Sequence, residues 1–386
     1  MTETLERTLT ASQMIQAFKD QKKIAAYEAK MAKEDGIPIV GYYCGFFPEQ
    51  MVWAAGGTTV MLCSTDGSVI AEAEKDLPVN LCPIVKSSYG MAKTDKCPFF
   101  HFADIVVGET TCEGKIKMYE MLNNIKPIYL MHLPNYQNDR AKKRWVAEMG
   151  DLKVFLEEKL GKKITEENLI KAVKLKNEIQ EAKNKLCSLM ELDPAPISGH
   201  DLFEVLNASL FIFDKESIPA RYNALYDKLI EEYNPTKLNK KPRILITGCP
   251  LGGTPEKIID MIEKNGGDVV SFENCSGEKN RNAFVDLEAD NIYESMAESY
   301  LNIGCAIMSP DKSRFRLLND LIYKYSIDGV VEMNLHACHP YIIESYRIKK
   351  LVMEDKETPY INIITDFSDS DSGQLNTRLG AFVEML

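Results

Sequence analysis

The sequence predicts an α/β protein with two Rossmann-like domains, each built on a parallel sheet, joined by a helical connector. Strand-like apolar runs alternate with helix-length segments from residue 37 to residue 133, and the alternation resumes at residue 241. Between about residues 137 and 235, long charged segments carry apolar residues at helical spacing instead. Strands that alternate with helices are typical of parallel sheets, so we expect one such sheet on each side of the connector.

The N-terminal domain, residues 1–136, is expected to begin with a polar helical arm over about residues 10–34. The run IPIVGYY then predicts a buried strand, and FPEQMVWAAGG predicts a helix that ends on glycine. Further strands are predicted at residues 58–63, 103–109 and 126–133. Together these elements make the first β-α alternation.

The helical connector, residues 137–240, contains segments such as KRWVAEMGDLKVFLEEKL that have no strand-like run. The C-terminal domain, residues 241–386, is predicted to start with the strand KPRILITG and to continue with strands at GDVVSFE, DGVVEMN and PYINIITD. The two halves share an architecture but show no residue-by-residue repeat.

Composition narrows the classes of function. The 386 residues are 45% hydrophobic and 27% charged, as in a globular protein, and the net charge of -11 disfavours nucleic acid as a partner. The first residues carry acids and lack the basic start and apolar run of a signal peptide, and no later stretch is apolar enough to span a bilayer. We therefore expect a cytoplasmic protein that binds neither membrane nor nucleic acid.

Ten cysteines point to metal or redox chemistry, because a reducing compartment disfavours disulfides. Most of them stand where a ligand would bind, since parallel sheets bind ligands beyond the carboxyl ends of their strands. The cysteines that follow predicted strands are Cys44, Cys112, Cys249, Cys275 and Cys338. Cys82 and Cys305 lie in loops predicted to start helices. We expect these thiols to face one crevice between the two domains.

The other three cysteines, Cys63, Cys97 and Cys187, are interpreted as buried structural residues, the ordinary role of a single cysteine. The chain has no C-x-x-C pair, which disfavours a zinc ribbon. Thiolates from separate loops can instead hold an iron–sulfur cluster, and helix N-termini favour the thiolate form. An iron–sulfur cluster is therefore the expected cofactor.

Polar residues directly after Cys82 could donate hydrogen bonds to such a cluster: Lys86, Ser87, Ser88 and Tyr89. They could equally form an ordinary first helical turn with a solvated lysine.

Two histidines, His336 and His339, flank Cys338 and could ligate metal or carry protons, although a structural hydrogen-bonding role is also open. The turn TGCPLGGTPEK resembles a phosphate-binding loop but lacks the P-loop lysine-hydroxyl ending and the dinucleotide spacing, so we expect no ATP or NAD site. A glycine-rich turn that gives access to the cluster is the preferred interpretation.

Several stretches together resemble the 2-hydroxyacyl-CoA dehydratase and benzoyl-CoA reductase superfamily, most closely its double-cubane cluster branch. They run through both halves and are GYYCGFFPEQMVWAAGG, LPVNLCPIVKSSYG, DIVVGETTCEGKIKMYEML, TGCPLGGTPEKIIDMIEKNGGDVVSFENCSG, DGVVEMNLHACHPYIIES and ITDFSDSDSGQLNTRLGAFVEML. The resemblance implies an electron-accepting component, a homodimer in this branch. Its partner would be a separate ATP-hydrolysing iron–sulfur activator.

The resemblance also implies a ligand set. In the dehydratase branch three cysteines hold one [4Fe-4S] cluster, and by motif these are Cys82, Cys112 and Cys338. The double-cubane [8Fe-9S] cluster needs six, and Cys44, Cys275 and Cys305 are chosen to complete them. Cys249 is held in reserve should Cys44 prove structural.

The expected activity is reduction of a small-molecule substrate at the double-cubane cluster, with protons from Glu109, His336 or His339 and with Lys86 as a further catalytic candidate. One alternative is a 2-hydroxyacyl-CoA dehydratase subunit with a single [4Fe-4S] cluster. A second is a non-catalytic carrier of electrons or clusters. A third is a plain α/β binding protein with buried thiols.

Overall fold

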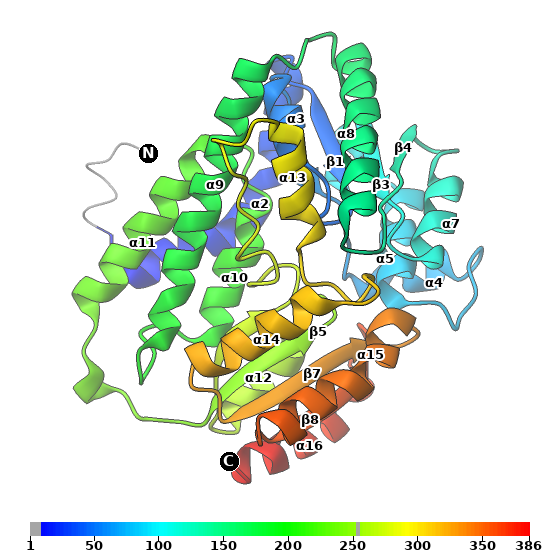
Figure 1. The fold of residues 1–386 in the computed structure, drawn as a ribbon. Coiled ribbons are helices and arrows are strands. Elements are labelled where there is room, and N and C mark those ends of the chain that lie inside the picture. Colours follow the sequence, from blue (N-terminus) through cyan, green and yellow to red (C-terminus); the bar gives the residue numbers. More distant parts are fainter. Residues whose placement is uncertain (1–8, 252–254) are drawn as a thin grey trace. The chain divides into compact units, whose positions relative to one another are not determined.

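A computed structural model describes residues 9–251 and 255–386. These residues form eight strands in two four-stranded sheets, in which every strand pairing is parallel (Figure 1). The predicted α/β class with two Rossmann-like sheets is therefore confirmed. All eight strands lie within the segments expected from the sequence, apart from one residue at the end of β7 (Gly329–Leu335). None of the helices in the described ranges combines the length and apolar character needed to cross a membrane.

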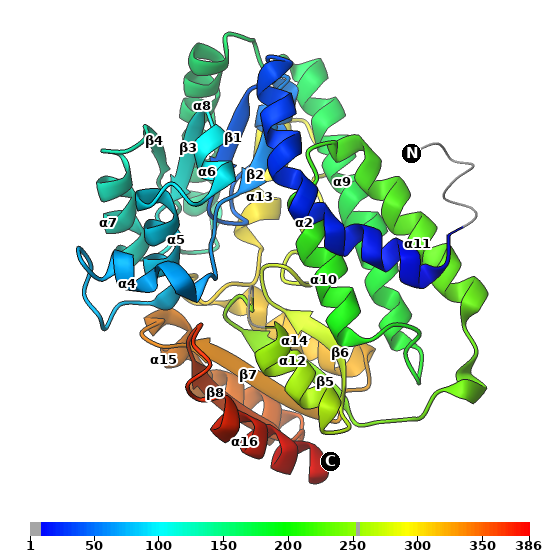
Figure 2. The ribbon, with the colours of Figure 1, turned by 180° about the vertical axis from the view of Figure 1, so that it is seen from behind.

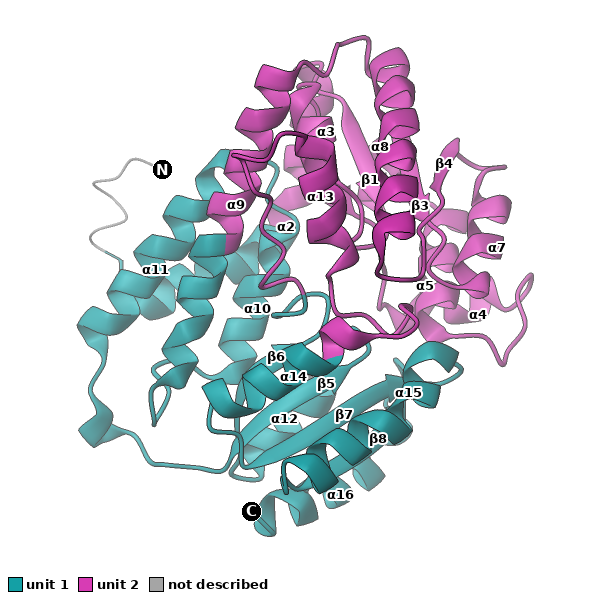
Figure 3. Cartoon of the chain, in the orientation of Figure 1, with its two compact units in different colours: residues 1–22, 181–279, 315–386 teal, residues 23–180, 280–314 magenta. Residues whose placement is uncertain are grey.

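The chain divides into two compact units, coloured separately in Figure 3. Unit 1 comprises residues 1–22, 181–279 and 315–386, and unit 2 comprises residues 23–180 and 280–314. The divisions fall within α2 (Ala11–Glu34), α9 (Glu166–Ser188) and α14 (Lys312–Lys324), and in the loop after residue 279.

Unit 2 contains the first sheet, whose strand order is β2-β1-β3-β4. The strands are β1 (Ile39–Tyr42), β2 (Thr58–Met61), β3 (Ile105–Glu109) and β4 (Ile128–Met131). Every residue of β1 and β3 is buried, which explains why both read as largely apolar runs. Its helices are α3 (Glu49–Ala54), α4 (Ile70–Ala73), α5 (Pro83–Lys93), α6 (Pro98–Phe102), α7 (Glu113–Leu122), α8 (Asp139–Leu160) and α13 (Ile292–Leu301), with a short 3-10 turn η1 (Gly67–Val69).

The longest helix of unit 2 is α8, and its ends follow ordinary capping rules. The side chain of Asn138 accepts a hydrogen bond from the Ala141 N–H at the start, and Gly161 ends the helix with φ +68°. The apolar face of α8 buries Trp145 completely, and α8 packs against α13. Residues 280–314 are thus joined to the first sheet through this helix pair.

Unit 1 contains the second sheet, whose strand order is β6-β5-β7-β8. Its strands are β5 (Arg243–Gly248), β6 (Asp268–Glu273), β7 and β8 (Tyr360–Thr365). Its helices are α10 (Gly199–Ser209), α11 (Ile218–Glu232), α12 (Pro255–Lys264), α15 (His339–Lys350) and α16 (Ser372–Glu384), with short turns η2 (Leu189–Glu191), η3 (Lys215–Ser217), η4 (Pro235–Lys237) and a π-helical turn η5 (Leu351–Asp355). The helices α12 and α16 pack together on one face of the sheet, while α14 and α15 lie on the other (Figures 1 and 2).

The two sheets have equivalent strand orders. In each, the chain adds its second strand on one side of the first strand and its third and fourth strands on the other side. The order therefore reverses between β1 and β3 in unit 2, and between β5 and β7 in unit 1. Ligands of open parallel sheets bind at such a reversal, beyond the carboxyl ends of the strands.

Candidate functional site

Two of the predicted site cysteines follow the strands at the reversal point of unit 2. Cys44 lies two residues after β1, at the start of the turn that its carbonyl oxygen closes with the Phe47 N–H, and Cys112 follows β3, which pairs with β1. Both cysteines are partly exposed. The sheet therefore places these thiols at the carboxyl edge, as the sequence predicted.

Cys82 and Cys112 each stand at the N-cap position of a helix, α5 and α7 respectively. Pro83 occupies the first turn of α5, which suits its fixed φ and missing N–H. The helices α5 and α7 pack together, and a Cβ built on Gly114 in the first turn of α7 would lie 3.6 Å from Val85 Cγ2 in the first turn of α5. Both thiols consequently stand at the starts of neighbouring helices in unit 2.

Glu109 is the last residue of β3 and is completely buried. Neither of its carboxylate oxygens has a hydrogen-bond partner among the described residues. Burial raises the pKa of Glu109 to about 8, against the charge of Lys115 and the backbone amides of Glu109 and Cys44. At neutral pH this side chain is therefore mainly a neutral acid.

Lys115, on α7, lies among these groups. Its Nζ is 3.3 Å from the Tyr43 carbonyl oxygen and 3.7 Å from Cys63 Sγ, while the Cys63 thiol donates to the same carbonyl at 2.8 Å. Burial opposes the charged form of Lys115, yet nearby acidic groups, Cys63 foremost and Cys44 and Glu109 among them, raise its pKa well above the usual value. The ammonium and a thiol thus share one part-buried environment.

The polar residues after Cys82 hold a neighbouring loop. Lys86 is buried, and its ammonium binds Glu74 Oε1 and the Val79 carbonyl oxygen, each at 2.7 Å. The Ser87 hydroxyl donates to Ser64 Oγ at 2.7 Å. These contacts tie α5 to residues 64–79.

The other two residues of this group make similar contacts. Ser88 Oγ accepts a hydrogen bond from the Ser64 N–H, and the Tyr89 hydroxyl donates to Asp76 at 2.8 Å. Burial, the hydrogen bond to Asp76 and its charge raise the pKa of Tyr89 to about 12. All four predicted side chains therefore have partners within unit 2.

Cys305 also lies in unit 2, in the loop between α13 and α14. It is 7% exposed, and its carbonyl oxygen accepts a hydrogen bond from the Met308 N–H at 2.9 Å. The following helix begins only at Lys312. Cys305 therefore differs from Cys82 and Cys112, which directly precede helices.

In unit 1 the turn between β7 and α15 carries Cys338 and both candidate histidines. Cys338 is the N-cap residue of α15 and is partly exposed. His336 and His339 are exposed on either side of it. Ala337 has φ +56°, a left-handed conformation that is uncommon for residues other than glycine and that often marks functional turns.

Cys249 follows β5 but is only 1% exposed. Its sulfur accepts a hydrogen bond from the Leu335 N–H at 3.4 Å and lies 3.9 Å from Asn334 Oδ1, so it is held between β5 and β7. The glycine-rich turn after Cys249 includes residues 252–254, which lie outside the described residues.

Cys275 follows β6 and is partly exposed. Lys279 is buried, with its Nζ 3.9 Å from Cys275 Sγ and bound to the Tyr341 hydroxyl. Tyr341 belongs to α15, the helix that Cys338 begins. Lys279 thus connects the loop of Cys275 to the helix of Cys338.

Exposure divides the ten cysteines into two groups. Cys97, Cys187, Cys249 and Cys305 are buried, whereas Cys44, Cys63, Cys82, Cys112, Cys275 and Cys338 are partly exposed. Burial raises the pKa of the Cys97 thiol, whose sulfur accepts a hydrogen bond from the Phe100 N–H. No disulfide joins any of the ten, all of which lie in the described ranges.

No three or more His, Cys, Asp or Glu side chains in those ranges lie close enough to hold a metal ion. The chemistry of the donors nevertheless suits an iron–sulfur cluster, because partly exposed thiols stand at helix N-termini and strand ends with lysine ammonium groups beside two of them.

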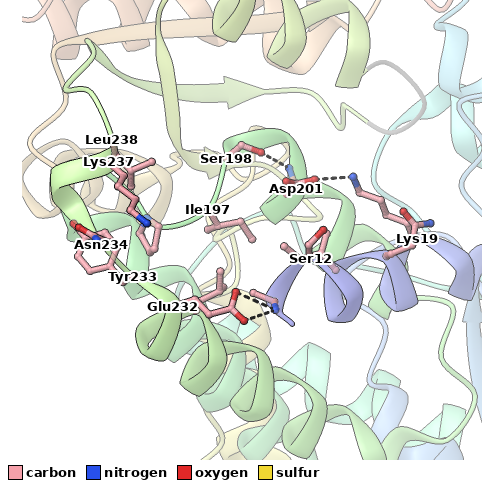
Figure 4. A pocket seen from close by; sticks show the side chains of 15 residues that line it. Ser12, Lys19, Ile197, Ser198, Asp201, Glu232, Tyr233, Asn234, Lys237 and Leu238 are labelled. Atoms are coloured by element: carbon pink, nitrogen blue, oxygen red, sulfur yellow. Dashed lines mark hydrogen bonds and ion pairs between the residues drawn. The ribbon is translucent and has the colours of Figure 1, made fainter. Parts of the chain in front are cut away.

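A separate cavity of about 530 Å³ in unit 1 lies between α2, α10 and α11 (Figure 4). Glu232 accepts hydrogen bonds from the Ala11 N–H at its edge, and Lys19 pairs with Asp201 at 2.6 Å. Its lining contains none of the candidate cysteines.

Residues 44–386 match the family model of the 2-hydroxyglutaryl-CoA dehydratase D-component, and the chain belongs to this family. The expected membership in the 2-hydroxyacyl-CoA dehydratase and benzoyl-CoA reductase superfamily is therefore confirmed. The chain is 47% identical to the "Putative dehydratase subunit YjiM" of Escherichia coli (strain K12), over 92% of this chain and 93% of that protein.

Two more distant relatives cover nearly the whole chain. The lactoyl-CoA dehydratase subunit beta of Anaerotignum propionicum is 24% identical over 96% of this chain and 99% of its own length. A benzoyl-CoA reductase subunit of Thauera aromatica is 20% identical over 90% of each chain. These relatives are named as dehydratase and reductase subunits, which supports an enzymatic role for this chain.

Proposed function

We propose that this chain is the iron–sulfur component of a cytoplasmic reductase, which accepts low-potential electrons from a separate ATP-hydrolysing activator and reduces a small molecule. The observation that carries the proposal is the placement of Cys44, Cys82, Cys112, Cys275 and Cys338. All five are partly exposed, and each follows a strand or begins a helix within a dehydratase-family chain.

The proposed cofactor is a double-cubane [8Fe-9S] cluster. The ligand set is Cys44, Cys82, Cys112, Cys275, Cys305 and Cys338, with Cys249 in reserve. A cluster bound there would supply one-electron chemistry at low potential. The proposed assembly is a homodimer that binds the activator, and the activator would supply the ATP site.

Protons for the reduction are proposed to come from this chain's own acids. Glu109 holds a proton on a buried carboxyl oxygen near pH 7, because its pKa is about 8. His336 and His339 lie exposed beside Cys338 and can exchange protons with solvent. Lys86 is proposed to act indirectly. Its ion pair with Glu74 holds α5, the helix that Cys82 begins, in place.

Metal analysis of anaerobically purified protein tests the cluster. We expect roughly eight irons per chain, since a double cubane contains two four-iron units. Roughly four irons would reject the double cubane, and colourless protein free of iron and sulfide would reject the whole proposal. A low-temperature electron paramagnetic resonance spectrum of the reduced protein reports the same difference independently.

A second candidate is a 2-hydroxyacyl-CoA dehydratase subunit with one [4Fe-4S] cluster. One observation favours it: the three cysteines that the resemblance assigns to that cluster, Cys82, Cys112 and Cys338, are all helix N-cap residues. This candidate requires a dissimilar second subunit and a coenzyme A thioester as substrate. Recovery of a heterodimer with about four irons per chain would favour it over the reductase.

Electron transfer from the activator separates an enzyme from a carrier. If the chain is a reductase, it should oxidise the reduced activator continuously, in the presence of ATP, for as long as a substrate is available. Reduction that stops after one cluster equivalent, with every offered substrate unchanged, would instead identify a non-catalytic electron or cluster carrier.

A further inference from the structure

The same arrangement of a thiol beside a lysine occurs in both units. In unit 2, Lys115 Nζ lies 3.7 Å from Cys63 Sγ, and in unit 1, Lys279 Nζ lies 3.9 Å from Cys275 Sγ. The strand β2 ends at Met61 just before Cys63, and β6 ends at Glu273 just before Cys275.

The two positions are topologically equivalent. The strands β2 and β6 are the second strand of their sheets and occupy the same place in the orders β2-β1-β3-β4 and β6-β5-β7-β8. Cys63 thus stands in unit 2 where Cys275 stands in unit 1. By the same comparison of strands, Cys44 after β1 corresponds to Cys249 after β5. Cys112 after β3 corresponds to Cys338 after β7.

The environment of Cys63 in unit 2 differs from that of a structural cysteine. Cys63 is partly exposed, whereas Cys97 and Cys187 are buried. The same ammonium that lies beside it also interacts with Glu109, whose two buried oxygens have no hydrogen-bond partner in the described part of the chain. A buried carboxyl whose oxygens lack hydrogen-bond partners is typical of a catalytic or ion-binding position, and this one lies near the Lys115 ammonium.

We propose that Cys63 is a ligand of the cluster, in the place assigned above to the buried Cys305, and that Lys115 and Lys279 are positioning cations beside the thiolates. This inference rests on the proposed function. The cations stabilise the more negative, reduced form of a thiolate-bound cluster and so raise its reduction potential. Neither lysine contacts the substrate in this scheme.

The ligand assignment is tested by comparing Cys63→Ser with Cys305→Ser, purified anaerobically. We expect Cys63→Ser to lose at least half of the iron and Cys305→Ser to retain the wild-type content. The opposite result would overturn this inference while leaving the proposed function and its ligand set intact. Wild-type protein without iron or sulfide would overturn both.

The lysines are tested by spectroelectrochemical titration of Lys115→Met and Lys279→Met. Each loss of a cation should shift the equilibrium between reduced and oxidised cluster at least tenfold toward the oxidised form, about 59 mV for a one-electron couple. Matched controls are Lys117→Met on α7 and Lys350→Met on α15, both exposed lysines, which should keep the wild-type potential.

Arginine variants distinguish charge from packing. Lys115→Arg and Lys279→Arg keep the positive charge and should keep the wild-type potential within a few millivolts of the controls. If the methionine variants lose their iron, no cluster potential can be measured for them. The potentials of the arginine variants are then the only test. A methionine variant with full iron and an unshifted potential, or an arginine variant shifted tenfold, would overturn the role of the cations.

Discussion

Glu263 offers a quantitative test of the structure that does not depend on any cofactor. It lies on α12, and its Oε1 accepts a hydrogen bond from the N–H of Gly199 at 2.7 Å, at the start of α10. Burial raises its pKa from 4.5 to about 7, helped by the charge of Asp268 and opposed by His200 and the backbone amides of Gly199 and His200. The ionised carboxylate is therefore disfavoured in the fold.

The change to examine is Glu263→Gln, which keeps an oxygen for the Gly199 N–H and cannot ionise. One pKa unit corresponds to about 1.36 kcal/mol. A carboxyl with a pKa of about 7 in the fold and 4.5 when unfolded thus destabilises the ionised fold by roughly 3 kcal/mol. Because the folded pKa is the higher one, this cost is absent below pH 4.5, grows as the pH rises, and is complete above pH 7.

The assay is urea unfolding of the wild type and the variant at several pH values between 4 and 8. Hydrogen exchange of peptides from β5 and β6 confines the comparison to unit 1. We expect equal stability near pH 4 and a glutamine variant more stable by up to about 3 kcal/mol at pH 8. A difference that does not change with pH, or a variant less stable at pH 8, would refute the buried-acid reasoning.

Three other changes have definite expected outcomes. Cys112→Ala should abolish iron binding and activity, while Cys187→Ala at a buried structural position should leave both near wild type, as iron analysis and the activator-coupled assay will show. Gly199→Ala places a Cβ 2.3 Å from the Val269 carbonyl oxygen and should destabilise unit 1 by about 1–3 kcal/mol in urea unfolding, unlike Gly150→Ala, whose site is open. Trp145→Ala empties a fully buried site in unit 2 and should cost about 3–5 kcal/mol; a loss under 1 kcal/mol would contradict the packing of α8.

The sequence predicted the strands well because both sheets are parallel and their two central strands are buried. A strand covered on both faces reads as a continuous apolar run, as in β1 and β5, where every residue is buried. The positions of Cys44, Cys112 and Cys338 followed directly, since each lies just past such a run.

Lys115 and Lys279, the lysines beside the thiols, could not be predicted from apolar runs in the sequence. Lys115 lies on a charged helical segment, EGKIKMYEML, where lysine ordinarily faces solvent. Its sulfur neighbour, Cys63, comes from a distant loop, and the apolar run TTVMLC continues past the end of β2, so that Cys63 read as part of a strand. Pairings between distant segments leave no local pattern.

Local sequence patterns also do not predict that residues 280–314 pack in the same unit as the first sheet. Segments 23–180 and 280–314 meet through contacts such as the hydrogen bond of 2.8 Å from Tyr300 to Gln50. Alternation of strands and helices reports the order of elements, but not which sheet a later helix joins.

The interleaved units also set the order in which the protein can mature on the ribosome. Unit 2 lacks its last segment until Arg314 has emerged, although its four strands are complete by Met131. The sheet of unit 1 lacks its last strand until Thr365 has emerged, and the helix α16, which packs against α12, follows it. Both units therefore acquire their final contacts late, and a prematurely terminated chain yields two incomplete cores rather than one finished domain.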